Sequence, residues 1–428
     1  MPVAEWSEEV KERISRAQAE THARRKSQRC RVYNLKIVGN KLTSVQRETL
    51  ERQFLEAKWL RNDCLAHGID DYVVGKTAEV KMPDGTFERR ELSHLGSSMK
   101  QSVVAQLKTD RSNLAKAKAK GRRVGTLRFS RAVTSIPLKA HGTDWKVKSA
   151  CKVKVQKVPG HLRVRGMGQV PKEAEFANAK LVSRPDGYHL MVTAFTPIED
   201  EEDAYVEGTF VGIDMGLETA VTLSSGEKID ACIGETERLK GLQRKLARQE
   251  RGSNRYAKTI SLIRREYQKM DARRDDAARK VCASLLENET VFMQDENIRG
   301  WKSRKGFARG GKTVQRSVLG RVKSRLKGHQ RVVVLPRGAA TTATCLKCGG
   351  KTKHLPDRRT FACASCGYEA DRDVHAAQNM VLMGIDLLPV ERRNTLVERL
   401  SGSVYDFDFA SVVAEHTAVK RETPKSLA

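Results

Sequence analysis

Two Cys-x-x-Cys pairs constrain the fold of this chain more than any other feature of its sequence. Cys345 and Cys348 form the first pair, Cys363 and Cys366 form the second, and 14 residues lie between the pairs. Each pair favours a tight turn, and four thiolates at this spacing are typical of a tetrahedral zinc site with no open position. We therefore expect a structural zinc ribbon at about 340–370. Two redox pairs or disulfides are the alternative, and the repeated spacing fits them less well.

Carboxylates follow the second cysteine pair closely. Asp371 and Asp373 form an Asp-x-Asp sequence that begins five residues after Cys366. The short separation suggests that the ribbon positions a carboxylate. In a chain rich in basic residues, a positioned carboxylate favours Mg²⁺ binding and phosphodiester chemistry, because Mg²⁺ prefers oxygen ligands.

The charge balance indicates a polyanionic partner. The 428 residues include 80 Lys and Arg against 52 Asp and Glu, which gives a net charge of +28. This excess fits a nucleic-acid enzyme, and a ribosome-associated or simply soluble basic protein would share it. The hydrophobic content of 39% allows folded cores, and the length predicts two or three domains.

The lack of recognisable targeting signals and the cysteine usage favour a cytoplasmic location. No apolar run approaches the ~20 residues that span a membrane. Residues 1–30 lack the apolar segment of a secretion signal. The five cysteines outside the two pairs are scattered and odd in number, which is typical of a reducing compartment. We expect a cytoplasmic protein with no membrane partner.

The first part of the chain begins with helical patterns. Residues 1–30 are charged and are expected to form a basic N-terminal extension. A strand over 31–38 precedes a helix that Thr43 and Gln46 can cap. A second helical stretch covers about 91–120.

Strand patterns then continue to a domain boundary near residue 205. Period-two alternation over 124–197, with a hairpin at Pro185-Asp186-Gly187, predicts a small β-barrel or sheet with one basic face. The acidic run over 199–203 is interpreted as a linker. The pattern therefore divides the chain into 31–205, with a helical insertion at about 42–123, and a second half.

The second half, 206–428, alternates apolar strands with helices. An apolar strand over 209–213 ends at Asp214, and a later strand over 291–296 ends in polar residues that include Asp295 and Glu296. A very basic helical region over 235–287, broken near Gly252, favours an antiparallel helical hairpin, although a coiled coil would have similar length and charge. Other apolar stretches predict strands at 220–223 and 331–335 and a helix at 374–383.

Basic side chains gather in three regions: 100–131, the helical hairpin and 302–331. The last region carries eleven Lys and Arg and no acidic residue. A solvated helix face would explain such runs, but we favour phosphate-contacting surfaces. The side chains expected to bind nucleic acid are Lys116, Lys118, Lys120, Arg122, Arg123, Arg244, Arg248, Arg255, Lys302, Arg304 and Lys305.

Three acidic positions stand at the ends of apolar elements: Asp214, the pair Asp295 and Glu296, and Asp373. Any one of them alone would more often be a turn or capping residue. Their order, two strand ends and then a helix start, is what a ribonuclease-H-like fold needs to hold two Mg²⁺ ions for phosphodiester hydrolysis.

With these motifs, the chain resembles the transposon-encoded TnpB proteins and their descendants, the compact type V CRISPR effectors. The resemblance covers roughly 206–384, and the first half agrees only in pattern, as a basic wedge β-barrel with an inserted helical recognition segment. The residues that carry it are 212–217, 252–255, 297–300, both cysteine pairs and 371–379.

The resemblance implies an RNA-guided DNA endonuclease with a RuvC domain and a zinc-bearing insertion that binds target nucleic acid. On it, Asp214 is the first Mg²⁺ ligand and Asp373 the third, while Asp371 is a neighbour. The partners it implies are a guide RNA and a double-stranded target DNA that is unwound to single strands, in a prokaryotic cytosol or nucleoid. It leaves the choice of monomer or dimer open.

The second Mg²⁺ ligand departs from the family pattern. The family usually has Glu-Asp-Leu-Asn here, whereas this chain has Gln294-Asp295-Glu296-Asn297, so Gln294 takes the place of the catalytic Glu. Because alternate strand residues share a face, Glu296 is our preferred ligand over Asp295. A guided protein that binds DNA without cutting it is the alternative function. A zinc-ribbon protein without a guide is a third hypothesis, which the spaced carboxylates disfavour.

Overall fold

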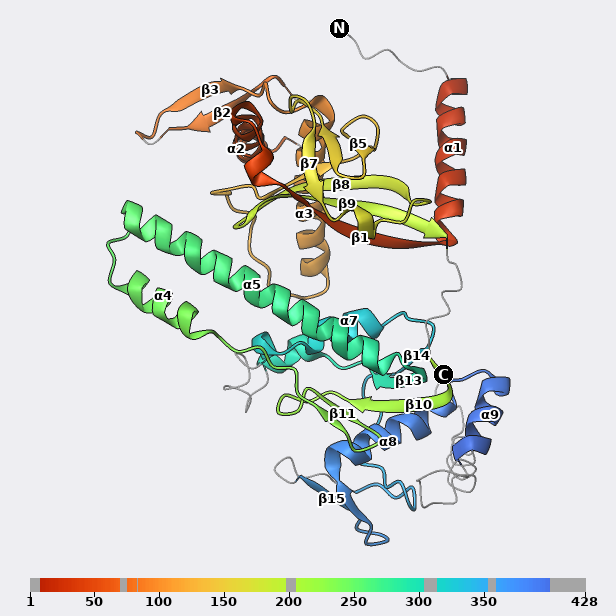
Figure 1. Cartoon of the computed structure of the whole chain (residues 1–428). Coiled ribbons are helices and arrows are strands. Elements are labelled where there is room, and N and C mark those ends of the chain that lie inside the picture. The colour runs from red at the N-terminus through yellow and green to blue at the C-terminus, as the bar shows by residue number, and fades with distance from the viewer. Residues whose placement is uncertain are drawn as a thin grey trace. The chain divides into compact units, whose positions relative to one another are not determined.

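The structure is a computed structural model that describes residues 8–69, 75–82, 84–197, 205–303, 314–352 and 359–400. These residues belong to two compact units, Met1–Glu201 and Glu202–Ala428. Both units contain helices and β-sheet, so the predicted α+β class is confirmed (Figure 1). In the ranges given, no helix combines the length and the apolar character that a membrane crossing requires.

The first unit is built on a seven-stranded antiparallel sheet in the order β4-β8-β9-β1-β7-β6-β5. The predicted hairpin at residues 185–187 is confirmed, since β8 and β9 pair up to Arg184 and Gly187. The observed pairings do not join β4 to β5, so they do not close the predicted barrel. The strands are β1 Gln28–Ile37, β4 Ser135–Leu138, β5 Trp145–Ser149, β6 Lys152–Val155, β7 Leu162–Arg165, β8 Glu175–Arg184 and β9 Gly187–Pro197.

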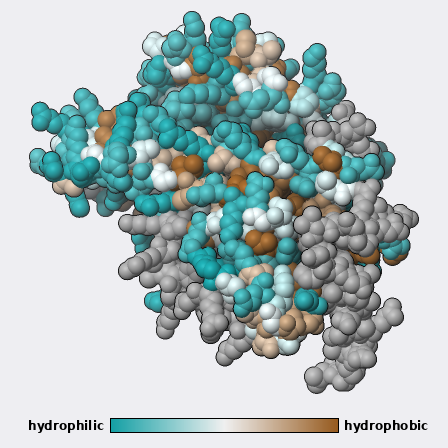
Figure 2. Space-filling model, turned by 60° about the horizontal axis from the view of Figure 1, so that its bottom comes forward, coloured by the Kyte–Doolittle hydropathy of each residue, from teal (hydrophilic) through white to brown (hydrophobic). Residues whose placement is uncertain are grey.

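Sequence alternation explains why this sheet has a basic face. In β7, Leu162 and Val164 are buried while Arg163 and Arg165 are exposed, and β6 repeats the pattern with valines and lysines. Period-two alternation therefore directs the apolar side chains into the core and the cations to solvent. On the face of the whole chain that Figure 2 draws, hydrophilic residues cover most of the coloured surface.

Three helices and a hairpin complete the unit: α1 Glu8–Lys26, α2 Ser44–Ala66, α3 Ser97–Ala119, and β2 Thr77–Lys81 with β3 Phe87–Glu91. The predicted cap of α2 is confirmed, because Thr43 and Gln46 form a reciprocal capping box. The extension expected over 1–30 is wrong in its bounds, because β1 already begins at Gln28 and pairs with β9. The helix expected from about 91 begins at Ser97, after a hairpin that the sequence did not predict.

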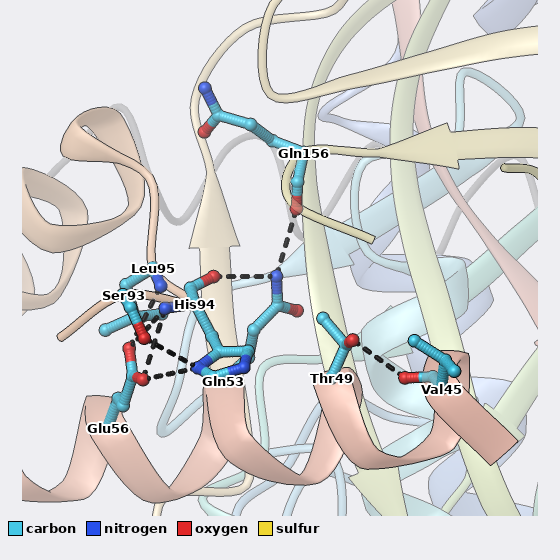
Figure 3. A network of polar contacts seen from close by, with 8 residues as sticks. All are labelled: Val45, Thr49, Gln53, Glu56, Ser93, His94, Leu95 and Gln156. Carbon is cyan, nitrogen blue, oxygen red and sulfur yellow. Dashed lines mark hydrogen bonds and ion pairs between the residues drawn. The ribbon is translucent and has the colours of Figure 1, made fainter. Parts of the chain in front are cut away.

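A buried polar network holds the chain where it enters α3 (Figure 3). Glu56 of α2 accepts hydrogen bonds from the backbone N–H groups of His94 and Leu95, at 2.9 and 3.0 Å, and contacts His94 Nδ1 at 2.7 Å. One turn away, Gln53 donates to the carbonyls of His94 and Gln156. These bonds satisfy backbone groups that burial would otherwise leave without partners.

The second unit contains a five-stranded sheet in the order β12-β11-β10-β13-β14. The neighbours β10, β13 and β14 run parallel, so the carboxyl ends of β10 and β13 lie at the same edge of the sheet. The strands are β10 Val206–Asp214, β11 Val221–Leu223, β12 Lys228–Ile229, β13 Asn288–Gln294 and β14 Val332–Leu335. The helices are α4 Glu237–Ala247, α5 Asn254–Leu285, α7 Leu319–Leu326, α8 Arg372–Ile385 and α9 Val390–Leu400.

Glycines allow α8 to lie directly on this sheet. A Cβ atom on Gly212 of β10 would lie 1.9 Å from the Ala377 carbonyl oxygen of α8. A Cβ on Gly384 would similarly meet the Phe292 ring of β13 at 2.3 Å. The two contacts fix the distance of α8 from the sheet and bring its first turn toward the end of β10.

Candidate metal and nucleic-acid sites

The four cysteines of the two pairs converge on one point. Their Sγ atoms all lie within 4.8 Å of one another. Two of the separations are 3.7 Å, from Cys345 to Cys366, and 3.6 Å, from Cys348 to Cys363. Tetrahedral zinc with Zn–S bonds of about 2.3 Å requires S···S edges of roughly 3.8 Å. The cluster therefore fits a four-coordinate zinc ion.

Backbone geometry makes each cysteine pair a preformed knuckle. The N–H of Gly349 donates to the Cys345 carbonyl and the N–H of Gly367 to the Cys363 carbonyl, and both glycines have positive φ. Burial raises the pKa of Cys345 to about 12, whereas at Cys363 the N–H donors of Cys366 and Ser365 outweigh burial and lower the pKa to about 6. A thiolate at neutral pH is the form that binds zinc.

The zinc ribbon is fastened to α8 by two side chains. The ribbon's strands β15 Thr360–Ala362 and β16 Glu369–Asp371 form a small sheet, and Phe361 stacks on His375 with ring centroids 3.8 Å apart. Asn379 donates to the carbonyls of Thr341 and Thr344 at 2.7 and 2.8 Å. His375 and Asn379 are fully buried, and burial lowers the pKa of His375 to about 4. The sequence analysis included both residues within 371–379 but predicted no role for them. Their i, i+4 spacing indicates that they lie on the same face of α8.

Asp214 ends β10 at the carboxyl edge of the sheet. Burial, and then the negative charges of Asp373 and Glu296, raise the pKa of Asp214 to about 7. The negative charges of Asp373 and Glu296 therefore act on the Asp214 carboxylate. The arrangement favours a cation, because a cation relieves the repulsion among the three.

Asp373 lies in the first turn of α8 and contacts two arginines. Its Oδ1 accepts from Arg372 Nε at 2.8 Å, and its Oδ2 lies 3.6 Å from Arg359. Asp371 is the N-cap of α8, since it accepts from the N–H groups of Asp373 and Val374 and pairs with Lys228. Asp371 is thus engaged in starting the helix that carries Asp373.

The structure gives different contacts to Gln294, which ends β13, and to Asp295 and Glu296, which follow it. Gln294 is 5% exposed and donates through Nε2 to the carbonyls of Ala339, at 2.9 Å, and Pro336, at 3.4 Å. Asp295 pairs with Lys323, Lys327 and Arg337, and the hydrogen bond from Lys323 in particular lowers its pKa. Glu296 is the member whose charge reaches Asp214.

Glu296 lies outside β13, contrary to the prediction that it shares a strand face with Gln294. β13 ends at Gln294, and the N–H of Glu296 donates back to the Gln294 carbonyl at 2.8 Å. Glu296 therefore follows a turn and does not share a strand face with Gln294. In the described ranges only the four cysteines bring their ligand atoms within 4.8 Å of one another, so the carboxylates are spaced more widely.

The cations predicted to bind nucleic acid are mostly exposed, and some of them share a cavity. Lys118, Arg122 and Arg123 line one cavity of about 640 Å³ at the end of α3. Arg244 and Arg248 line another, of about 410 Å³, at the end of α4. Exposed side chains also occur at Lys116, Lys120 and Arg255. Lys302 lies in a 3-10 helix, Ile298–Ser303, while Arg304 and Lys305 fall outside the described residues.

Two stretches of the chain match known families. Residues 195–291 match the OrfB_IS605 family, described as "Probable transposase", and residues 320–380 match "Cas12f1-like, TNB domain". Both matches agree with the resemblance to TnpB proteins and compact type V CRISPR effectors that the sequence motifs predicted. The second match covers the zinc ribbon and the start of α8, the part of this TnpB-like chain where the cysteines and Asp373 lie.

Curated relatives of this TnpB-like chain are provisionally named RNA-guided DNA endonucleases. The protein of Streptomyces pristinaespiralis is 34% identical over 184 residues, which cover 41% of this chain and 45% of the relative. InsQ of Escherichia coli (strain K12) is 26% identical over 212 residues, or 44% of this chain and 52% of the relative. The chain thus matches about half the length of each.

A solved structure that resembles this chain is a Cas12f1–sgRNA–target DNA complex. The match has a TM-score of 0.39 and 13% sequence identity, and it covers 78% of this chain and 81% of the solved chain.

Proposed function

We propose that this chain is a guide-RNA-directed DNA endonuclease with a Mg²⁺-dependent RuvC-type site. What supports the proposal is the placement of three carboxylates on separate elements, where the charges of Asp373 and Glu296 act on Asp214. Asp214 ends β10, Glu296 follows the parallel neighbour β13, and Asp373 lies on α8, which packs against β10 at Gly212.

The chemistry of this donor set fits Mg²⁺. All three groups offer hard oxygen ligands, and the mutual repulsion that raises the pKa of Asp214 is what a divalent cation relieves. Bound between such carboxylates, Mg²⁺ ions supply Lewis-acid activation of water and stabilise the leaving oxygen of a phosphodiester. Arg359 and Arg372, which now contact Asp373, provide positive charge beside the scissile phosphate.

The partners follow from the charge and from the relatives' names. A net charge of +28 favours a bound polyanion, and a guide RNA would neutralise much of it. The names of the curated relatives support a guide that pairs with one strand of a target DNA. The four cysteines would hold a structural zinc ion, and the ribbon would bind target nucleic acid beside the carboxylates.

The test begins with the RNA that co-purifies with the full chain. That RNA is sequenced, and a duplex matched to its guide portion is incubated with the ribonucleoprotein in Mg²⁺ and in EDTA. Cleavage in Mg²⁺ only supports the proposal. Tight binding of the matched duplex without cleavage would support the alternative, a protein that acts by occupancy, which Gln294 at the usual Glu position motivates. Absence of any co-purifying RNA would contradict both.

A further inference from the structure

The segment that leaves α3 and enters β4 exposes an aromatic side chain among cations. Phe129 is 65% exposed and lies between the exposed residues Arg128 and Arg131. Aromatic rings normally contribute to stability by burial, so a ring in this position lacks the usual structural reason.

Contacts on both sides hold this segment in place. The Asn62 side chain of α2 donates to the Ser130 carbonyl at 3.0 Å and accepts from the Ser130 N–H at 2.8 Å. Before and after the ring, Leu127 and Val133 pack against the hydrophobic core of the first unit. Phe129 is therefore presented by an anchored loop, and a ligand that binds it pays little entropy for ordering the protein.

A cavity of about 640 Å³ begins two residues before the ring. Its floor is apolar, from Leu65, Leu114 and Leu127, and its basic side chains include Lys118, Arg122 and Arg123. Residues 122–129 thus include the exposed ring as well as apolar and basic residues that line the cavity.

We propose that Phe129 is a stacking platform for an unpaired base of a bound nucleic-acid strand, whose flanking phosphates contact Lys118, Arg122 and Arg123. A nucleotide has the two matching parts: a flat π face for the ring and an anionic phosphate for the cations. A second copy of the chain would match less well, because two surfaces of this charge repel each other. The proposal rests on the nucleic-acid binding proposed above and adds the place where one base is held.

The test measures binding of short single strands to the full-length chain. RNA and DNA versions of one mixed sequence carry 2-aminopurine at several positions, since its fluorescence is quenched by stacking. Phe129→Ala should raise the Kd by about fivefold to about a hundredfold, the range for loss of one stacked base. It should also reduce the quenching, and Phe129→Trp should restore both. The arm with the larger effect, RNA or DNA, identifies the strand that supplies the base.

Two controls separate stacking from other effects. Phe87→Ala removes a ring of similar exposure, 63%, which lies near Lys81 on the β2–β3 hairpin, and should leave the Kd and the quenching unchanged. Phe129→Ala should keep the salt slope of binding, because it removes no phosphate contact. Arg122→Ala should reduce the slope by about 0.7.

Unchanged binding and quenching in Phe129→Ala would overturn the inference and leave the proposed function standing. A change of sedimentation mass in that variant, without a change in binding, would instead assign the ring to a contact between copies. A wild-type chain that binds neither strand would overturn the proposed function itself.

Discussion

The zinc ribbon and the carboxylate site, both in the second unit, prepare for metal in opposite ways. The four Sγ atoms already stand within 4.8 Å of one another. The three carboxylates are spaced more widely, and Asp373 is occupied by Arg359 and Arg372. The ribbon's ligands come from two local turns, whereas Asp214, Glu296 and Asp373 come from three elements far apart in the chain.

The difference reflects what each metal does. A structural zinc ion needs a closed tetrahedron that never changes, and two knuckles with glycine at positive φ build it locally. The proposed Mg²⁺ site would have to admit substrate and release product, which suits carboxylates that are more widely spaced, one of which, Asp373, contacts two arginines. Substitutions in either the ribbon or the carboxylate site test this contrast.

The largest effect is expected from the ribbon. Cys345→Ser should lose zinc and unfold the ribbon locally, because zinc contributes an apparent ~10–16 kcal/mol to the folding of such modules. Metal analysis and limited proteolysis would measure the loss. Cys232→Ser is the matched control, since Cys232 is an exposed cysteine outside the cluster. Normal activity in a preparation without zinc would refute the structural assignment.

At the carboxylate site, Asp214→Ala should reduce cleavage by more than about a hundredfold, because even outer-shell partners of a metal cost 10–100-fold. Binding of guide and target should persist, since the residue ends a strand and its loss opens no core. Cleavage rates and gel-shift affinities of the same preparation would separate the two effects. Near-normal cleavage would remove Asp214 from the mechanism.

Substitutions of the two acidic residues after β13 test which of them is a metal ligand and which has a structural role. Glu296→Gln should impair cleavage about as strongly as Asp214→Ala, while Asp295→Asn should cost less than about tenfold, because Asp295 pairs with Lys323 and Lys327. The pair of variants is matched, since each removes one charge at neighbouring positions. If Asp295→Asn proves the more damaging, the assignment of the second ligand is wrong.

Gln294→Glu tests the departure from the family pattern. A glutamate cannot donate to the carbonyls of Pro336 and Ala339, and it would bury a charge. We expect a loss of stability of about 1–3 kcal/mol, measured by thermal unfolding, with no gain in cleavage. A parent without cleavage whose activity appears in Gln294→Glu would favour the DNA-binding alternative.

The smallest expected effect is a dependence of Mg²⁺ binding on pH. Because the pKa of Asp214 rises from 3.8 to about 7 in the fold, its contribution to the stability of the metal-free protein falls as pH increases through that window. Mg²⁺ binds the deprotonated form, so its apparent affinity should rise about tenfold per unit up to pH ~7 and then level. The Mg²⁺-induced shift of Tm between pH 5 and 8 would measure this, and Asp214→Asn should abolish it.

The parts of the molecule set by neighbouring residues were predictable from sequence. The cysteine knuckles, the Thr43 cap and the turn at residues 185–187 each depend on a few adjacent residues. Features that depend on distant partners were not. The end of β13 follows from Gln294 bonding to carbonyls more than forty residues away, and no local pattern announces that turn.

Two other differences have the same origin. The helix α1 lacks an apolar face, and Arg24 and Arg25 at its end instead pair with Glu175 of β8, which a sequence pattern cannot reveal. The β2–β3 hairpin is short and mostly polar, so its period-two signal is weak. A joint site of Asp214 and Asp373 was expected from the order of the acidic residues along the chain and from the family resemblance.

The contact between Gly212 and Ala377 has a consequence for how this chain tolerates mutation. Gly68 has a φ of +69° with open space around it, so a saturation library should still recover asparagine or aspartate there. Gly212 has ordinary backbone angles but no room, and alanine, the smallest replacement, would already strike a backbone oxygen. In a selection for activity, every substitution at position 212 should therefore be depleted. Its depletion would match that of the metal ligands although it binds nothing, because it sets how far α8 stands from β10.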